Sequence, residues 1–247
     1  MSRCHFTRMS SPVIAALLLS LVTACAPAAN GGTASVPVPA PKIDAPLANH
    51  SGRATAVLAG GCFWGVQWVF EHVPGVINVT SGYSGGAART ATYEQVSEGD
   101  TGQAETVRIA YDPSQVSYGQ LLRVYFSVAT DPTELNRQGP DTGTQYRGVI
   151  FYATPEQQKI AKAYVAQLAA AHAFAAPIVT EVVPFKAFHP AEHYHQDYAR
   201  LHPDALYIAI NDAPKVAALQ RTLPKLYRAQ PVTWHADHPA AIMVDVH

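Results

Sequence analysis

The cysteine at position 62 is the side chain of this sequence best suited to act as a nucleophile. It lies in the run GCFWG at residues 61–65, between an apolar stretch that predicts a strand and a periodic stretch that predicts a helix. The N–H groups and dipole of a helix N-terminus favour a thiolate, and neighbouring glycines leave the sulfur accessible. Phe63 and Trp64 would add an apolar wall that accepts a small group such as an S-methyl. The alternative is a structural cysteine packed among aromatic side chains.

A carboxyl group at position 105 could supply a proton to such a reaction. Glu105 lies in an alternating stretch, residues 104–111, in phase with Val107, Ile109 and Tyr111. If that side of the strand faces the core, desolvation raises the pKa of the carboxyl group toward neutrality and makes it a proton donor. The alternative is an edge position at which Glu105 reaches solvent.

The elements that would position these residues alternate between strands and helices. Apolar runs and two-residue alternation predict strands at residues 54–59, 76–80, 104–111, 148–152 and 177–185. Helical spacing predicts helices that begin after Cys62 and that cover residues 121–128, 154–171, 191–201 and 214–223. With no internal repeat, this order predicts an α+β fold, an α/β sandwich with one mixed sheet flanked by helices.

Composition excludes some classes of partner. The 247 residues carry a formal net charge of −1 and contain no dense run of Lys and Arg, so neither nucleic acid nor a polybasic membrane contact is expected. The hydrophobic fraction of 48% is ample for a core. The length suits one domain with extensions, or two small domains.

The first 24 residues have the pattern of a secretory signal peptide. A basic start precedes a short run over residues 13–22, apolar except for one serine, and small residues follow. The run is too short to span a bilayer as a mature helix. Cys25 directly after the small residues resembles a bacterial lipoprotein cleavage site, which predicts lipidation at Cys25 and an anchor on the periplasmic face of a membrane. The alternative is an ordinary cleaved signal and a soluble periplasmic or secreted protein.

Three segments are expected in the mature chain. Residues 25–52 are rich in Pro and Ala and predict a disordered linker, residues 53–228 a catalytic domain, and residues 229–247 a surface tail. After processing and lipidation, Cys62 would be the one free thiol. An idle thiol is a hazard in an oxidising compartment, and this favours a reactive role for Cys62.

Five sequence blocks resemble the A-type peptide methionine sulfoxide reductases. They are GCFWG at 61–65, GYSGG at 82–86, TYE at 92–94, GDTGQAE at 99–105 and GTQYR at 143–147. The resemblance extends from about residue 56 to residue 227. It implies that family's fold, which is related to the ferredoxin-like fold. It also implies reduction of methionine sulfoxide, in its S epimer, both peptide-bound and free.

The same resemblance implies roles for individual residues. Cys62 matches the family's nucleophile, and Glu105 matches the acid that protonates the sulfoxide oxygen. A sulfoxide is a poor electrophile until its oxygen is protonated or strongly hydrogen-bonded, so an acid facing an apolar cage suits the reaction. Phe63 and Trp64 match the methyl-binding wall. The polar groups that hold the oxygen correspond to Tyr93, Asp141 and Tyr146.

No cysteine follows Cys62, so the sequence offers no partner that could trap an oxidised Cys62 as an internal disulfide. We therefore expect a sulfenic acid on Cys62 that an external thiol reduces, either a small thiol or a thioredoxin-like protein. We expect no bound cofactor, no metal and a monomeric protein that acts on oxidised proteins or peptides.

Two other classes of function remain open from sequence alone. A cysteine amidase or acyl-transfer enzyme would pair Cys62 with a histidine base, and His72 is the nearest in sequence. A metal-binding lipoprotein would use His189, His193 and His195 instead.

Overall fold

The structure is a computed structural model that describes residue 1 and residues 35–235. The predicted signal peptide, apart from Met1, and the predicted lipidation site at Cys25 lie outside the described residues. Among the residues described, no helix has the length and apolar character needed to cross a membrane.

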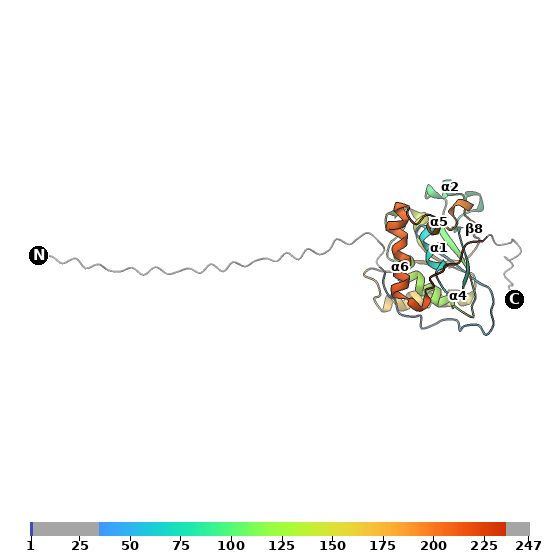
Figure 1. Ribbon diagram of the computed structural model, residues 1–247, viewed down its shortest axis with the longest axis horizontal. Coiled ribbons are helices and arrows are strands. Elements are labelled where there is room, and N and C mark those ends of the chain that lie inside the picture. The colour runs from blue at the N-terminus through green and yellow to red at the C-terminus, as the bar shows by residue number, and fades with distance from the viewer. Residues whose placement is uncertain (2–34, 236–247) are drawn as a thin grey trace. The chain divides into compact units, whose positions relative to one another are not determined.

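A mixed sheet forms the centre of the domain (Figure 1). It has six strands in the order β7-β6-β1-β3-β2-β8. Its neighbouring strands are antiparallel except β6 and β7, which are parallel. The strands are β1 (Ala54–Gly60), β2 (Val76–Ser84), β3 (Ala104–Tyr111), β6 (Gly148–Tyr152), β7 (Glu181–Pro184) and β8 (His189–Pro190). The predicted mixed sheet is thus confirmed, although the strand predicted at residues 177–185 is only four residues long.

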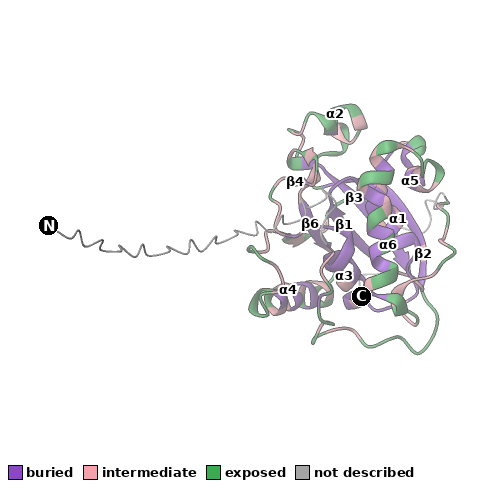
Figure 2. Ribbon diagram, turned by 60° about the vertical axis from the view of Figure 1, so that its left-hand side comes forward, coloured by how far each residue is buried: buried purple, intermediate pink, exposed green. Residues whose placement is uncertain are grey.

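The four longest helical elements pack on one face of this sheet. They are α1 (Phe63–Glu71), α3 (Tyr118–Val124, continued by a π-helical turn at Tyr125–Ala129), α4 (Pro155–Ala170) and α6 (Ala213–Thr222). One large apolar cluster joins all four helices to residues such as Leu58, Ile109 and Ile150 of the sheet. In Figure 2 the central strands are coloured mostly as buried, whereas helices such as α6 are buried along one side and exposed along the other. A smaller cluster on the other face includes Val57 and Phe151, covered by Phe185 and Phe188.

The remaining elements are short and lie in the connections. They are the helices α2 (Tyr93–Ser97) and α5 (Tyr198–Leu201), the hairpin β4 (Arg137–Gln138) and β5 (Asp141–Thr142), the π-helical turn Ile208–Asp212, and 3-10 turns at Ala88–Thr90, Thr144–Tyr146, His193–His195 and Pro224–Leu226. These connections carry three of the seven side chains expected at the site, namely Tyr93, Asp141 and Tyr146.

The helix predicted over residues 191–201 does not form as one element. Asp197 interrupts it with a φ of +56°, in the left-handed region that aspartate tolerates. Its N–H donates to the Gln67 side chain at 3.1 Å, and its carboxylate accepts hydrogen bonds from Arg200 and from the N–H of Trp234. The contacts with Gln67 and Trp234, which are distant in sequence, override the local helical pattern.

The segment before β1 differs from the disordered linker predicted for residues 25–52. In its described part, Val38 is 1% exposed, and the Pro39 carbonyl accepts a hydrogen bond from the Tyr164 hydroxyl of α4 at 2.6 Å. The Asp44 carboxylate accepts hydrogen bonds from a hydroxyl and an N–H group at the first turn of α3. Specific polar contacts therefore order a segment whose composition offers few large apolar side chains.

The surface tail predicted for residues 229–247 also begins within the folded domain. Val232 N–H donates to the Glu71 carbonyl at 3.0 Å, and Trp234 N–H donates to the Asp197 carboxylate at 3.1 Å. Residues 229–235 therefore belong to the domain. The rest of the predicted tail lies outside the described residues.

Candidate active site

Cys62 occupies the junction between β1 and α1, as the sequence predicts. It is the N-cap residue of α1, and only 7% of its surface is exposed. Gly61 makes this junction possible, because its φ is +91° and a Cβ atom there would lie 2.5 Å from the Cβ of Gln138. A glycine is required for the strand to turn into the helix this close to the β4–β5 hairpin.

The Cys62 thiol is harder to ionise than its place at a helix N-terminus suggests. Burial, and then the negative charges of Glu105 and Asp212, raise its pKa well above the ordinary value. The Trp64 N–H and the Lys215 ammonium oppose this rise with smaller effect. The prediction of a favoured thiolate is therefore wrong for the resting site, because desolvation outweighs the helix terminus. At neutral pH the thiol keeps its proton.

Glu105 lies beside Cys62 and on the core side of β3, as the alternation predicts. Its side chain is 4% exposed, and its Oε2 accepts a hydrogen bond from the N–H of Phe63 at 2.9 Å. Because Phe63 is joined directly to Cys62, this bond fixes the carboxyl group next to the nucleophile. Burial is the main cause that raises the pKa of Glu105 to about 8, against the lowering effect of the Phe63 N–H. The carboxyl group is therefore mostly protonated at neutral pH and can donate its proton.

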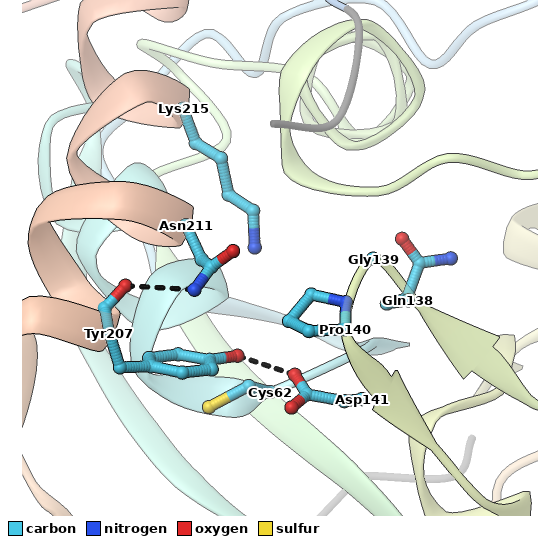
Figure 3. Close-up of a pocket in the computed structure, with 8 residues that line it drawn as sticks. All are labelled: Cys62, Gln138, Gly139, Pro140, Asp141, Tyr207, Asn211 and Lys215. Carbon is cyan, nitrogen blue, oxygen red and sulfur yellow. Dashed lines mark hydrogen bonds between the residues drawn. The ribbon is translucent and has the colours of Figure 1, made fainter. Parts of the chain in front are cut away.

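A hollow opens at Cys62 between the β4–β5 hairpin and the helical segment that leads into α6 (Figure 3). Asp141, from β5, lines it and accepts a hydrogen bond from the Tyr207 hydroxyl. Burial is the main cause that raises the pKa of the Asp141 carboxyl group, and the bond from Tyr207 opposes the rise. The thiol is thus reachable from solvent through a polar opening, and Asp141 lies where the resemblance implies. The lining residues are Cys62, Gln138, Gly139, Pro140, Asp141, Tyr207, Asn211 and Lys215.

An aromatic cluster adjoins Cys62 on the α1 side. The Trp64 ring stacks on Tyr198 with centroids 4.1 Å apart, and meets Tyr207 edge-on at 6.1 Å. Its Nε1–H donates to Nδ1 of His195 at 3.2 Å, which holds the indole in one orientation. Phe63 lies deeper, 1% exposed, and its ring is 5.1 Å from that of His195. Trp64 is therefore the more open of the two predicted wall residues, and Phe63 supports it from within.

The two predicted phenols approach the site from separate connections. Tyr93 begins α2, and Tyr146 ends the 3-10 turn that follows β5. Burial first, and then the nearby Glu105 carboxylate, raise the pKa of both hydroxyl groups. Both phenols therefore stay protonated at neutral pH and can donate hydrogen bonds near Glu105. Neither lies among the residues that line the hollow at Cys62.

A buried ion pair closes the far side of the site. Lys215 Nζ lies 3.2 Å from Oδ1 of Asp212, and the second carboxylate oxygen, Oδ2, has no hydrogen-bond partner among the described residues. Asp212 packs against the first turn of α1, where a Cβ on Gly65 would lie 2.0 Å from its Oδ1. The second glycine of the GCFWG run therefore makes room for this carboxylate. The pair places a positive and a negative charge close to Cys62.

Sequence reasoning missed several residues that the structure brings to the site. The available signal was the four-residue spacing of Tyr207, Asn211 and Lys215, which places them in one row on a helix. They lie more than 140 positions after Cys62 in the sequence, and no motif links the two segments. The residues that only the structure places near Cys62 or its aromatic wall are His195, Tyr198, Tyr207, Asn211, Asp212 and Lys215.

The structure gives no support to the two alternative functions. None of the described residues that line the hollow is a histidine, and His195 already accepts a hydrogen bond from Trp64. Over the described ranges, no group of three or more His, Cys, Asp or Glu side chains is arranged to hold a metal ion.

Comparison with known proteins decides the family. A family model described as peptide methionine sulfoxide reductase matches residues 54–226. The chain belongs to this family. The peptide methionine sulfoxide reductase MsrA 2 of Mesorhizobium japonicum is 57% identical over 181 residues, which cover 73% of this chain and 93% of that protein. The MsrA 2 of Synechocystis is 48% identical over 195 residues, or 78% of this chain and 91% of that protein.

Solved structures support the same assignment. The methionine sulfoxide reductase A of Corynebacterium diphtheriae is 34% identical with a TM-score of 0.53, and the match covers 70% of this chain and 87% of that one. Mxr1 from Saccharomyces cerevisiae in reduced form is 29% identical with a TM-score of 0.55, over 65% of this chain and 94% of that one. The predicted family, its A type and the α+β fold are confirmed. This member of the family is an oxidoreductase that reduces methionine sulfoxide.

Proposed function

We propose that the chain reduces the S epimer of methionine sulfoxide, peptide-bound and free, through a sulfenic acid on Cys62 that an external thiol then reduces. The observation that carries this mechanism is the hydrogen bond from the Phe63 N–H to Glu105. It holds a carboxyl group with a pKa of about 8 beside the only free cysteine among the described residues. The preference for the S epimer rests on the family resemblance.

In the first step, the Cys62 sulfur attacks the sulfoxide sulfur as a thiolate. Glu105 gives its proton to the sulfoxide oxygen, and the thiol proton of Cys62 replaces it on the carboxyl group. The phenols of Tyr93 and Tyr146 and the Asp141 carboxyl group are polar partners for that oxygen. The oxygen then moves from the substrate sulfur to the Cys62 sulfur: the substrate S–O bond and the new S–S bond break, and an S–O bond to Cys62 forms. Methionine leaves, and Cys62 is left as a sulfenic acid.

In the second step, an external thiol attacks the sulfenic sulfur, forms a mixed disulfide with Cys62 and releases water. A second thiol then frees Cys62 and leaves as a disulfide. A small thiol or a thioredoxin-like protein can supply both thiols. The absence of any cysteine after Cys62 in the sequence supports an external reductant over an internal one.

One equivalent of each methionine sulfoxide epimer, offered in a peptide to the fully reduced protein, tests the mechanism. Mass spectrometry should find one added oxygen on the Cys62 peptide with the S epimer only, and Cys62→Ser should show none with either. An internal disulfide in place of the oxygen adduct would refute the sulfenic acid route. If the sulfenic acid forms as proposed, repeated turnover should require added dithiothreitol or a thioredoxin system.

The cellular setting is a further part of the proposal. The basic start, the apolar run and the placement of Cys25 support export and lipid anchoring, and hence repair of oxidised proteins in the cell envelope. Growth with a labelled fatty acid should label the wild-type protein and leave Cys25→Ser unlabelled. Equal labelling of both would remove the anchor from the proposal.

A further inference from the structure

Residues of the helical segment beside Cys62 form four rows, and three of these rows differ in their surroundings; the fourth contains only alanines, Ala209, Ala213 and Ala217. Residues four positions apart lie in one row on a helix. One row faces the core and contains Ile208, Asp212 and Val216, all buried. The second row lines the hollow and contains Tyr207, Asn211 and Lys215, which come from successive turns in Figure 3.

The third row, here called the outer row, contains Leu206, Ile210 and Pro214. Leu206 is 76% exposed and Ile210 is 52% exposed, and Pro214 is also exposed. A solvent-facing row of a surface helix is ordinarily polar. Here it is apolar along two turns of the segment that forms one wall of the hollow.

The outer row adjoins the hollow because of the helical geometry. Successive residues are rotated by about 100° on an α-helix and by less in the π-helical turn Ile208–Asp212, so in either geometry the row of Leu206 precedes that of Tyr207, which precedes that of Ile208. The hollow-lining row therefore lies between the core and the outer row. A side chain inserted toward Cys62 enters beside Tyr207, and its neighbours in the same polypeptide must pass over the rim of the hollow.

We propose that the outer row is a docking surface for the polypeptide that carries the oxidised methionine, and that it favours sulfoxides flanked by apolar residues. This inference rests on the reduction of peptide-bound methionine sulfoxide at Cys62. The occupant follows from the position of the row, which is continuous with the entrance to the reactive sulfur. Apolar flanks of this kind are exposed in unfolded or locally opened segments of a protein. The substrate class is therefore extended, apolar polypeptide segments.

Three substrates separate docking from chemistry. They are N-acetyl-methionine sulfoxide amide, which has no neighbouring residues, and two pentapeptides with a central S-epimer sulfoxide flanked on both sides by Ser or by Leu. With wild-type protein, kcat/KM for the Leu peptide should exceed that for the Ser peptide about tenfold, as expected for partial burial of leucine side chains. Reduction of the amide depends on Cys62 chemistry alone, so the amide stays unreduced only if the proposed function is wrong.

The combined variant Leu206→Ala and Ile210→Ala should lower the Leu-over-Ser ratio to about twofold, mainly through KM, and leave the amide unchanged. Both side chains are exposed, so the fold should tolerate the change. Leu47→Ala is the matched control, because Leu47 is 49% exposed and its neighbour Ala48 bonds to Pro113, beyond the end of β3 opposite to Cys62. This control should keep the wild-type ratio.

Two results would overturn the proposal. One is a Leu-over-Ser ratio in the combined variant equal to that of the wild type. The other is an equal loss of kcat/KM on all three substrates, which would mean that the outer row acts by supporting Tyr207. Size-exclusion chromatography tests a second copy of the chain as the occupant. A wild-type dimer that the combined variant dissociates, with an unchanged ratio, would assign the row to self-association instead.

Discussion

Replacing Glu105 with Gln separates the acidity of the site from the reactivity of the Cys62 thiol. Glutamine keeps the size of the side chain and can still accept the hydrogen bond from the Phe63 N–H. It cannot give an acidic proton to the sulfoxide oxygen, and it carries no charge that opposes ionisation of Cys62. Reduction of sulfoxide should therefore become slower while alkylation of the thiol becomes faster at alkaline pH.

The magnitudes follow from the pKa of Glu105, which burial raises to about 8. The carboxyl group is then about nine-tenths protonated at pH 7 and about one-tenth at pH 9. The pKa of Cys62 is higher than that of Glu105. Cys62 and Glu105 together hold two protons at low pH, and the reactive form, a Cys62 thiolate beside a protonated Glu105, has lost one of them. Wild-type kcat/KM should rise with pH up to about 8 and then level off, because further gain in thiolate is offset by loss of the acid. Loss of the general acid should cost about 10²–10⁴-fold near neutrality.

The assay is thiol-coupled reduction of a sulfoxide peptide between pH 6 and pH 9, together with alkylation of Cys62 by iodoacetamide over the same range. Glu105→Gln should remove the levelling near pH 8 and alkylate like wild type at pH 7 but faster at pH 9. Glu98→Gln, at an exposed carboxylate, is the control. Wild-type rates of reduction in Glu105→Gln, or a wild-type profile that rises unchanged through pH 8, would refute the assignment of Glu105 as the acid.

Three further predictions concern stability, each measured by urea unfolding. Gly65→Ala should lower the free energy of unfolding by about 1–3 kcal/mol or more, because the new Cβ would lie 2.0 Å from the Asp212 carboxylate; an unchanged midpoint would mean that Asp212 moves freely. Burial raises the pKa of Glu71 to about 10, so the folded state retains a proton that the unfolded state loses above about pH 4.5, and stability falls as pH rises between those values. The free energy of unfolding of Glu71→Gln should therefore rise relative to that of wild type by up to about 1.4 kcal/mol per pH unit from pH 5.5 to 8.5. A difference between the two proteins that does not change with pH would contradict this. Asp44→Ala should cost about 1–2 kcal/mol through loss of the contacts at the start of α3, and no loss would imply that the segment before β1 contributes nothing.

The sequence predicted the parts of the site that depend on local pattern. The apolar run before Gly61 and the helical spacing after Cys62 place the thiol at a strand–helix junction, and the structure has that junction. The alternation of β3 correctly places Glu105 toward the core. Each of these inferences uses residues within about ten positions of one another, where backbone geometry alone fixes which side chains share a face.

The rest of the site depends on contacts between distant segments. Tyr207 bonds to Asp141, which lies 66 positions earlier in the sequence, and no periodicity links the two. The expected thiolate character of Cys62 was wrong because the sequence reveals the helix terminus but not the burial of the sulfur. Asp197 likewise breaks a regular helical pattern because of bonds to Gln67 and Trp234 that only the folded chain brings within reach.

Contacts made by residues outside 54–226 matter for the design of shortened forms of this protein. A protein cut to the family-matched range would lose Asp44 from the start of α3 and Val38 from the core. It would also lose Arg228, whose guanidinium donates to the carbonyls of Glu71 and Val76, and Trp234, whose N–H holds Asp197. A fragment that keeps all of these contacts therefore runs from about residue 35 to about residue 235, and it extends beyond the family-matched range at both ends.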